Sequence, residues 1–199
     1  MYEEHFRSVG WSSSDIPVVV AVLRVSLGLR ISEALALKWS DIEGRGNKLR
    51  VDRAIVCQNI DDVKTAGSTK PLPPAAGLRV RLKEWHGSTQ FAGDRDWVFA
   101  SPVQLGRLPC SHDQIWRVYQ KASKASGIGR LGTHAFRHTY RSWLDAVGTT
   151  VAVQQRLMRH ADPSMTLRYG DVVTDEMERA NEQIANLALN ELQQGLQPS

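Results

Sequence analysis

Apolar residues recur at helical spacing near the start of the chain, and the pattern breaks at one glycine. Ser14 or Asp15 can cap a helix that has Pro17 in its first turn, where proline is tolerated. Gly28 interrupts the period, and a second short helix opens after Arg30. The predicted core positions of these two helices are Ile16, Val19, Val20, Leu23, Leu27, Leu35 and Trp39.

A segment rich in β-branched residues follows the turn at residues 44–47. Residues 48–58 contain valine and isoleucine at a density typical of a strand. Two shorter strands are predicted at residues 62–65 and 69–72, on either side of a turn at 66–68, and the prolines that follow end the sheet. The segment therefore predicts a small three-stranded antiparallel sheet.

Helical spacing returns after the sheet and continues to the end of the chain. A helix is expected from about residue 75 to 85, and the apolar segment 97–99 follows it. Ser111 and Gln114 form a capping box for the next helix. The fold class is accordingly α+β and mainly helical. The remaining predicted helices begin near Thr133, Thr150, Asp162 and Thr174. The first of these carries the stripe Phe136, Tyr140, Leu144 and Val147, and the last carries the stripe Met177, Ala180, Ile184, Leu187 and Ala188.

Composition limits the compartment and favours one kind of partner. The 199 residues carry a formal net charge of +4 and a pI near 9.3, which suits a polyanion without identifying one. The two cysteines, Cys57 and Cys110, are too few for a disulfide framework. No long apolar run or signal peptide is present, so we expect a cytoplasmic protein. The length of the chain predicts a single domain.

Candidate chemistry is concentrated between residues 131 and 169. His134 and Arg137 are three positions apart, so they share one helix face and can converge on a small anion. Arginine presents a planar fork of donors that matches phosphate oxygens. Tyr169 follows His160 by nine residues, and a tyrosine hydroxyl becomes a nucleophile beside cations or a base. These residues indicate attack on a phosphodiester.

A zinc site is the alternative for the histidines. His134 and His138 have the His-x-x-x-His spacing that can bind zinc on a helix, with His160 as a possible third ligand. However, Arg137 lies between the first two, and no cysteine or acidic residue stands at a matching spacing. A metal site would also leave the tyrosine unexplained.

Three sequence boxes, in order, resemble the tyrosine recombinase (phage integrase) family. Residues 28–42, GLRISEALALKWSDI, are similar to its first arginine box. Residues 63–73, VKTAGSTKPLP, are similar to the hairpin that carries its catalytic lysine. Residues 131–169 contain its His-x-x-Arg motif, a later histidine and the tyrosine. The resemblance implies the DNA breaking-rejoining fold and covers roughly residues 15–172.

The resemblance also implies a role for each motif residue. Arg30 and Arg137 would bind the scissile phosphate, and Glu33 on the helix face of Arg30 would hold a cation in place. Lys64 would protonate the departing 5′ oxygen, although Lys70 competes for this role. In the remaining roles, His134 would handle a proton, His160 would donate a hydrogen bond to the phosphate, His138 would be structural, and Tyr169 would be the nucleophile.

The sequence departs from the family pattern in two places. The family usually has glycine before the histidine at position 160, whereas this chain has Arg159, which would either displace His160 slightly or add a phosphate contact. Typical members also carry an N-terminal helical domain, which we expect to be absent from these residues, because the first arginine box begins within 30 residues of Met1. The chain is then either a catalytic fragment or one of the family's single-domain members. Residues 1–13 would then be a stub, and residues 174–199 a C-terminal helix and tail.

The predicted function is site-specific DNA recombination through a 3′-phosphotyrosyl intermediate, without a metal or other cofactor. The expected partner is double-stranded DNA, and the resemblance implies four protomers on paired sites with the last helix, residues 174–192, docked onto a neighbour. Free protomers would be monomers or weak oligomers, and no membrane partner is expected. Two alternatives remain: an enzyme related to type IB topoisomerases, and a truncated, non-catalytic DNA-binding regulator.

Overall fold

The chain forms a mainly helical structure with little sheet, which confirms the predicted α+β class. The computed structural model describes residues 15–43, 47–56, 59–62, 71–132, 134–159 and 172–195. Its strands are β1 (Ile42–Glu43), β2 (Lys48–Leu49), β3 (Arg53–Val56) and β4 (Asn59–Asp62). Its helices are α2 (Ile16–Leu27), α3 (Ile31–Leu35), α4 (Ala76–Ser88), α5 (His112–Ala125), α6 (Ala135–Ala146), α7 (Val151–Leu157) and α8 (Val172–Gly195), with a 3-10 turn at Trp39–Asp41.

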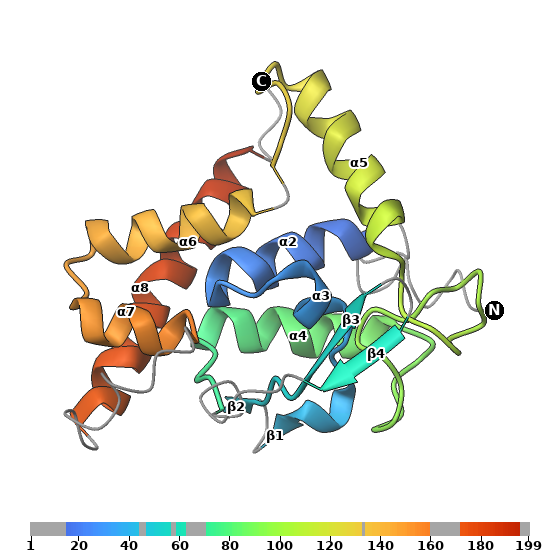
Figure 1. Ribbon diagram of the computed structural model, residues 1–199, viewed down its shortest axis with the longest axis horizontal. Helices are drawn as coiled ribbons and strands as arrows, with labels where there is room; N and C mark the ends of the chain where they lie inside the picture. Colours follow the sequence, from blue (N-terminus) through green and yellow to red (C-terminus); the bar gives the residue numbers. More distant parts are fainter. Residues whose placement is uncertain are drawn as a thin grey trace.

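Helix α2 lies at the centre of the fold. It contacts α3, α4, α5, α6 and α8, and Figure 1 shows it between α6 and α4. Val20 and Leu23 are completely buried, and all seven predicted core positions of α2, α3 and the 3-10 turn are confirmed. Gly28 ends α2 at a φ of 63°, the left-handed conformation that glycine adopts without steric cost.

The β segment is divided, which corrects the single strand predicted over residues 48–58. β3 pairs with β4 as an antiparallel hairpin with Val56 opposite Asn59, whereas β2 pairs with β1. The chain bends between β2 and β3 because Leu49 and Val51 enter the core while Arg53 binds both carboxylate oxygens of Asp41. Of the predicted third strand, Leu72 forms a bridge with Leu49. Residues 63–70 lie outside the described residues.

Helices α4 and α5 follow the sequence expectation closely. The capping box of α5 is confirmed, since the Gln114 amide donates to Ser111 Oγ and the Ser111 amide donates to Gln114 Oε1. Val98, in the predicted apolar segment, is completely buried and its amide donates to the Leu37 carbonyl. This contact joins residues 97–99 to the chain just after α3.

Helix α8 packs against its own chain, and the docking onto a neighbour that the resemblance implied stays a prediction. It contacts α2, α4, α6 and α7, and in Figure 1 it passes beside α6 and α7. Its stripe is rotated slightly from the prediction, because Leu187 is 40% exposed. Among the α8 side chains that the structure describes, those of residues 176–188, the buried ones are Ala180, Asn181, Ile184, Ala185 and Ala188.

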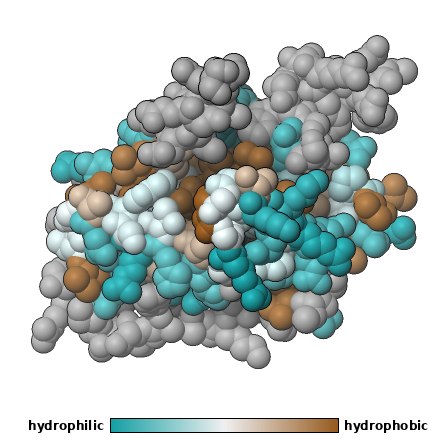
Figure 2. Space-filling view, turned by 90° about the horizontal axis from the view of Figure 1, so that it is seen from above, coloured by the Kyte–Doolittle hydropathy of each residue, from teal (hydrophilic) through white to brown (hydrophobic). Residues whose placement is uncertain are grey.

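The surface has a mixed character. Figure 2 looks onto the molecule from above Figure 1 and shows apolar residues gathered in a hollow of this face, with hydrophilic residues on either side. Among the helices that the structure describes, none is both long and apolar enough to cross a lipid bilayer.

Candidate active site

Arg30 lies where the chain turns at Gly28 and a new helix, α3, begins. Arg30 is the N-cap of α3, and its carbonyl accepts from the amides of Glu33 and Ala34. Glu33 holds it twice: Oε2 accepts from the Arg30 amide at 2.7 Å, and Oε1 accepts from Arg30 Nη1 at 2.9 Å. The Arg30 side chain is 46% exposed and that of Glu33 only 3%. A buried carboxylate therefore orients an accessible guanidinium.

Arg137 lies behind this pair and is buried. It occupies the first turn of α6, and its Nη1 and Nη2 donate to the carbonyls of Gly28 and Met158. It thereby joins the end of α2, the start of α6 and the end of α7. Arg30 is close enough for its charge to act on Arg137.

The pKa of Arg137 is lowered from its usual value to about 10. Burial is the largest cause, and the positive charges of Arg30 and Arg159 act in the same direction, whereas Glu33 opposes them. At neutral pH the guanidinium remains protonated. Its charge stands in a medium that screens it less than water does, which strengthens its action on a nearby anion.

Gly28 has a second constraint besides its left-handed φ. A Cβ at this position would lie 2.5 Å from Cδ1 and 2.8 Å from Cε1 of the Tyr140 ring. Tyr140 is completely buried, and its hydroxyl donates to Asn181 of α8 at 2.6 Å. The glycine thus lets α2 and α6 approach closely enough for Arg137 to reach the Gly28 carbonyl.

Arg159, the departure from the family pattern, has a φ of 51°, in the region that favours glycine. Its side chain is only 3% exposed, and Nη2 forms an ion pair with Oε2 of Glu33. Burial lowers its pKa, an effect that Glu33 opposes. The backbone requirement behind the usual glycine is therefore present here, and arginine meets it.

His134 and His138 lie at the surface next to the buried arginines. His134 is the N-cap of α6, and the two rings are 6.5 Å apart between centroids. His134 and Arg137 share one end of α6 but differ in burial, since only the histidine is exposed. No cluster of three or more metal-binding side chains occurs within the described part of the chain.

Three predicted site residues lie outside the described residues, namely Lys64, His160 and Tyr169, as do the competing Lys70 and the predicted helix cap Thr133. The structure thus brings together Arg30, Glu33 and Arg137 and adds Arg159. The phosphate contact that the sequence offered for Arg159 does not fit a side chain that is only 3% exposed. Sequence analysis missed the buried Asn181, for which the signal was a polar residue within the apolar stripe of the last helix.

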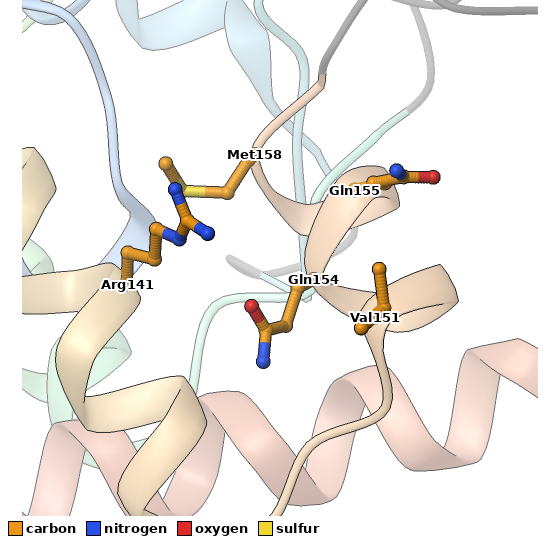
Figure 3. A pocket seen from close by; sticks show the side chains of 5 residues that line it. All are labelled: Arg141, Val151, Gln154, Gln155 and Met158. Atoms are coloured by element: carbon orange, nitrogen blue, oxygen red, sulfur yellow. The ribbon is translucent and has the colours of Figure 1, made fainter.

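A small pocket lies between α6 and α7, next to the buried arginines. Figure 3 shows its lining residues Arg141, Val151, Gln154, Gln155 and Met158, with Arg141 extending toward Met158. Its volume is about 110 Å³, enough for a few water molecules and too small for a nucleotide. The accessible face of Arg30 is therefore the better candidate for binding a DNA phosphate.

The phage integrase family model matches residues 18–176, a span that contains Arg30 and Arg137. The chain belongs to the phage integrase family. It is 27% identical over 190 residues to a XerC-like tyrosine recombinase of Caldanaerobacter subterraneus subsp. tengcongensis, covering 83% of this chain and 48% of that relative. It is 28% identical to the probable integrase/recombinase YoeC of Bacillus subtilis, covering 74% of this chain and 73% of YoeC.

Solved integrases share the fold of this family member. The integrase of mycobacterium phage Brujita matches with a TM-score of 0.59 and 18% identity, over 85% of this chain and 52% of the phage protein. The Tn1549 transposon integrase, solved with a circular intermediate DNA, matches with a TM-score of 0.61 and 20% identity, over 89% of this chain and 63% of that one. The chain thus spans about half the length of the XerC-like relative and of the phage integrase.

Proposed function

We propose that this phage integrase family member is a site-specific DNA recombinase that cleaves and rejoins DNA through a tyrosine. The observation that carries the proposal is that Arg30 and Arg137, more than a hundred positions apart in the matched region, lie close enough for their charges to act on each other beside the buried Glu33. The Arg30 guanidinium is accessible to a phosphate, and the buried Arg137 guanidinium adds its positive charge from behind Arg30. This arrangement offsets the negative charge that develops on a phosphate under attack.

In the proposed reaction, the Tyr169 oxygen attacks the phosphorus and the bond to the 5′ oxygen breaks. Lys64 gives a proton to the departing 5′ oxygen, while His134 takes part in moving the tyrosine proton. The product is a 3′-phosphotyrosyl bond and a free 5′ hydroxyl. A hydroxyl of another strand reverses the attack, so rejoining needs no nucleotide hydrolysis.

His160, His138 and the positive charges of the two arginines have the remaining roles in this mechanism. His160 donates a hydrogen bond to the phosphate, and the exposed His138 supports the neighbouring His134 without touching the reacting atoms. Arg30 and Arg137 supply fixed positive charge, so the reaction as proposed requires no metal or organic cofactor. The catalytic domain comprises residues 1–199, of which 174–199 form the C-terminal helix and tail.

Double-stranded DNA is the proposed partner, a view that the Tn1549 integrase supports, because that relative was solved with DNA. We propose four protomers on two paired sites, in the cytoplasm at the nucleoid. The net charge of +4 suits such a polyanion.

The test is covalent trapping on a nicked DNA substrate, from which the 5′ product diffuses away. We expect a protein–DNA adduct that forms in excess chelator and disappears in Tyr169→Phe, with DNA binding nearly unchanged. Tyr2→Phe, a tyrosine outside the matched motifs, is the control and should retain the adduct. An adduct in Tyr169→Phe, or a strict need for added metal, would refute the mechanism. Relaxation of supercoiled DNA without paired sites would indicate the topoisomerase alternative.

A further inference from the structure

Arg159 occupies a position where local physics disfavours arginine twice. Its φ of 51° brings the Cβ of any residue other than glycine too close to its own backbone. Its guanidinium is also removed from water, with only 3% of the side chain exposed. Two unfavourable terms at one residue require an interaction that offsets them.

That interaction is with Glu33, which also holds Arg30. Oε1 of Glu33 accepts from Arg30 Nη1, and Oε2 accepts from the Arg30 amide and from Arg159 Nη2. The carboxylate is therefore fixed from both of its oxygens. Without Arg159, the side-chain hydrogen bonds left to Glu33 among the described residues would be those to Arg30.

The charges around this carboxylate do not cancel. Besides the buried Arg24, the guanidinium groups of Arg30, Arg137 and Arg159 all act on the single Glu33. In addition, Nε and Nη1 of Arg159 are buried and lack a hydrogen-bond partner among the described residues. The group thus carries an excess of positive charge, part of it in a weakly screened interior.

We propose that Arg159 is a positioning residue for Arg30: through Glu33 it fixes the Arg30 guanidinium and adds a third positive charge behind the phosphate site. Arg159 itself is too buried to touch DNA, so its action passes through the carboxylate. This inference rests on the proposed function for its effect on cleavage. Its effect on Arg30 does not depend on that function.

The left-handed φ makes Arg159→Gly an unusually clean variant. Glycine relieves the backbone, so any loss in the variant reports the side chain alone. Leu105→Gly is the matched control, because Leu105 also has a φ of 51° but its side chain is 71% exposed. Arg159→Lys retains the charge without the planar fork.

The first measurement is the single-turnover rate of adduct formation at saturating DNA, beside the DNA dissociation constant. A misplaced catalytic group costs about 100-fold in rate, so we expect a loss of that order in Arg159→Gly, with DNA affinity changed only a few-fold. Arg159→Lys should be intermediate, and Leu105→Gly should match the unmodified protein. Guanidinium ion, well below unfolding concentrations, should partly restore the rate of the glycine variant alone. A rate equal to that of the unmodified protein in Arg159→Gly would overturn the inference.

The second measurement is independent of activity. With ¹⁵N-labelled arginine, the side-chain N–H signals of Arg30, assigned by their loss in Arg30→Lys, report whether its guanidinium is held. We expect distinct signals in the unmodified protein and averaged signals in Arg159→Gly, or in Arg159→Lys if the glycine variant fails to fold. Unchanged signals refute the positioning role. Changed signals in a protein that forms no DNA adduct would retain the positioning role and refute the proposed function instead.

Discussion

Replacing Asn181 by alanine tests whether α8 is held by its own chain in solution, as the structure has it. Asn181 is completely buried, and its side chain joins three elements. Oδ1 accepts from the Tyr140 hydroxyl at 2.6 Å, and Nδ2 donates to the Pro73 carbonyl at 2.8 Å. The asparagine thus links α6 to the chain just before α4, where Glu182 accepts from the Ala76 amide at 2.9 Å.

The expected cost follows from the two partners that the substitution leaves behind. Each buried polar group left without a hydrogen bond costs about 1–3 kcal/mol. Asn181→Ala strands the Tyr140 hydroxyl and the Pro73 carbonyl, so we expect a loss of about 2–6 kcal/mol in the free energy of unfolding. Asn186→Ala makes the same chemical change on the exposed face of α8 and should stay within about 0.5 kcal/mol.

The assay is urea unfolding followed by circular dichroism. Asn181→Ala should lower the transition midpoint without changing the slope, because the unfolded chain exposes the same surface. Combining it with Tyr140→Phe should give a coupling of about 1 kcal/mol, since both changes remove one hydrogen bond. If Asn181→Ala and Asn186→Ala have equal stability, α8 is not docked on its own chain, and the neighbour docking implied by the family resemblance gains support.

Two further predictions concern DNA binding and pH. Each neutralised phosphate contributes about 0.9 to the slope of log affinity against log salt. We therefore expect weak, salt-sensitive binding to one DNA half-site that strengthens on two adjacent half-sites. Tight, salt-resistant binding to a single half-site would contradict this prediction. Burial raises the pKa of the Cys110 thiol to about 11 from its usual 9.0, so the folded state holds that proton more firmly than the unfolded state. The contribution of this thiol to stability is complete below pH 9 and is lost as the pH rises toward 11. The urea midpoint should therefore fall more steeply between pH 9 and pH 11 in the unmodified protein than in Cys110→Ala. An equal dependence of the midpoint on pH in the two proteins would refute this prediction.

The sequence by itself determined the features that depend on neighbours within one or two turns. The stripe of α2, its end at Gly28 and the Ser111–Gln114 capping box follow from spacing alone. The contact of Glu33 with Arg30 belongs to the same class, because residues three apart on a helix share a face. The boxes around these residues also indicated the family, which the match over residues 18–176 confirms.

The tertiary structure alone decided which distant groups meet. The division of the β segment depends on Arg53 reaching Asp41, and the burial of Arg137 depends on carbonyls at the ends of α2 and α7. The pairing of Arg159 with Glu33 spans 126 positions. Periodicity assigns a residue to a face but not to a partner on another element, because that partner is set by how the helices pack around α2. For the same reason, the arginine at position 159 reads in the sequence as a departure from a glycine pattern, whereas in the folded chain it is the partner of the carboxylate that holds Arg30.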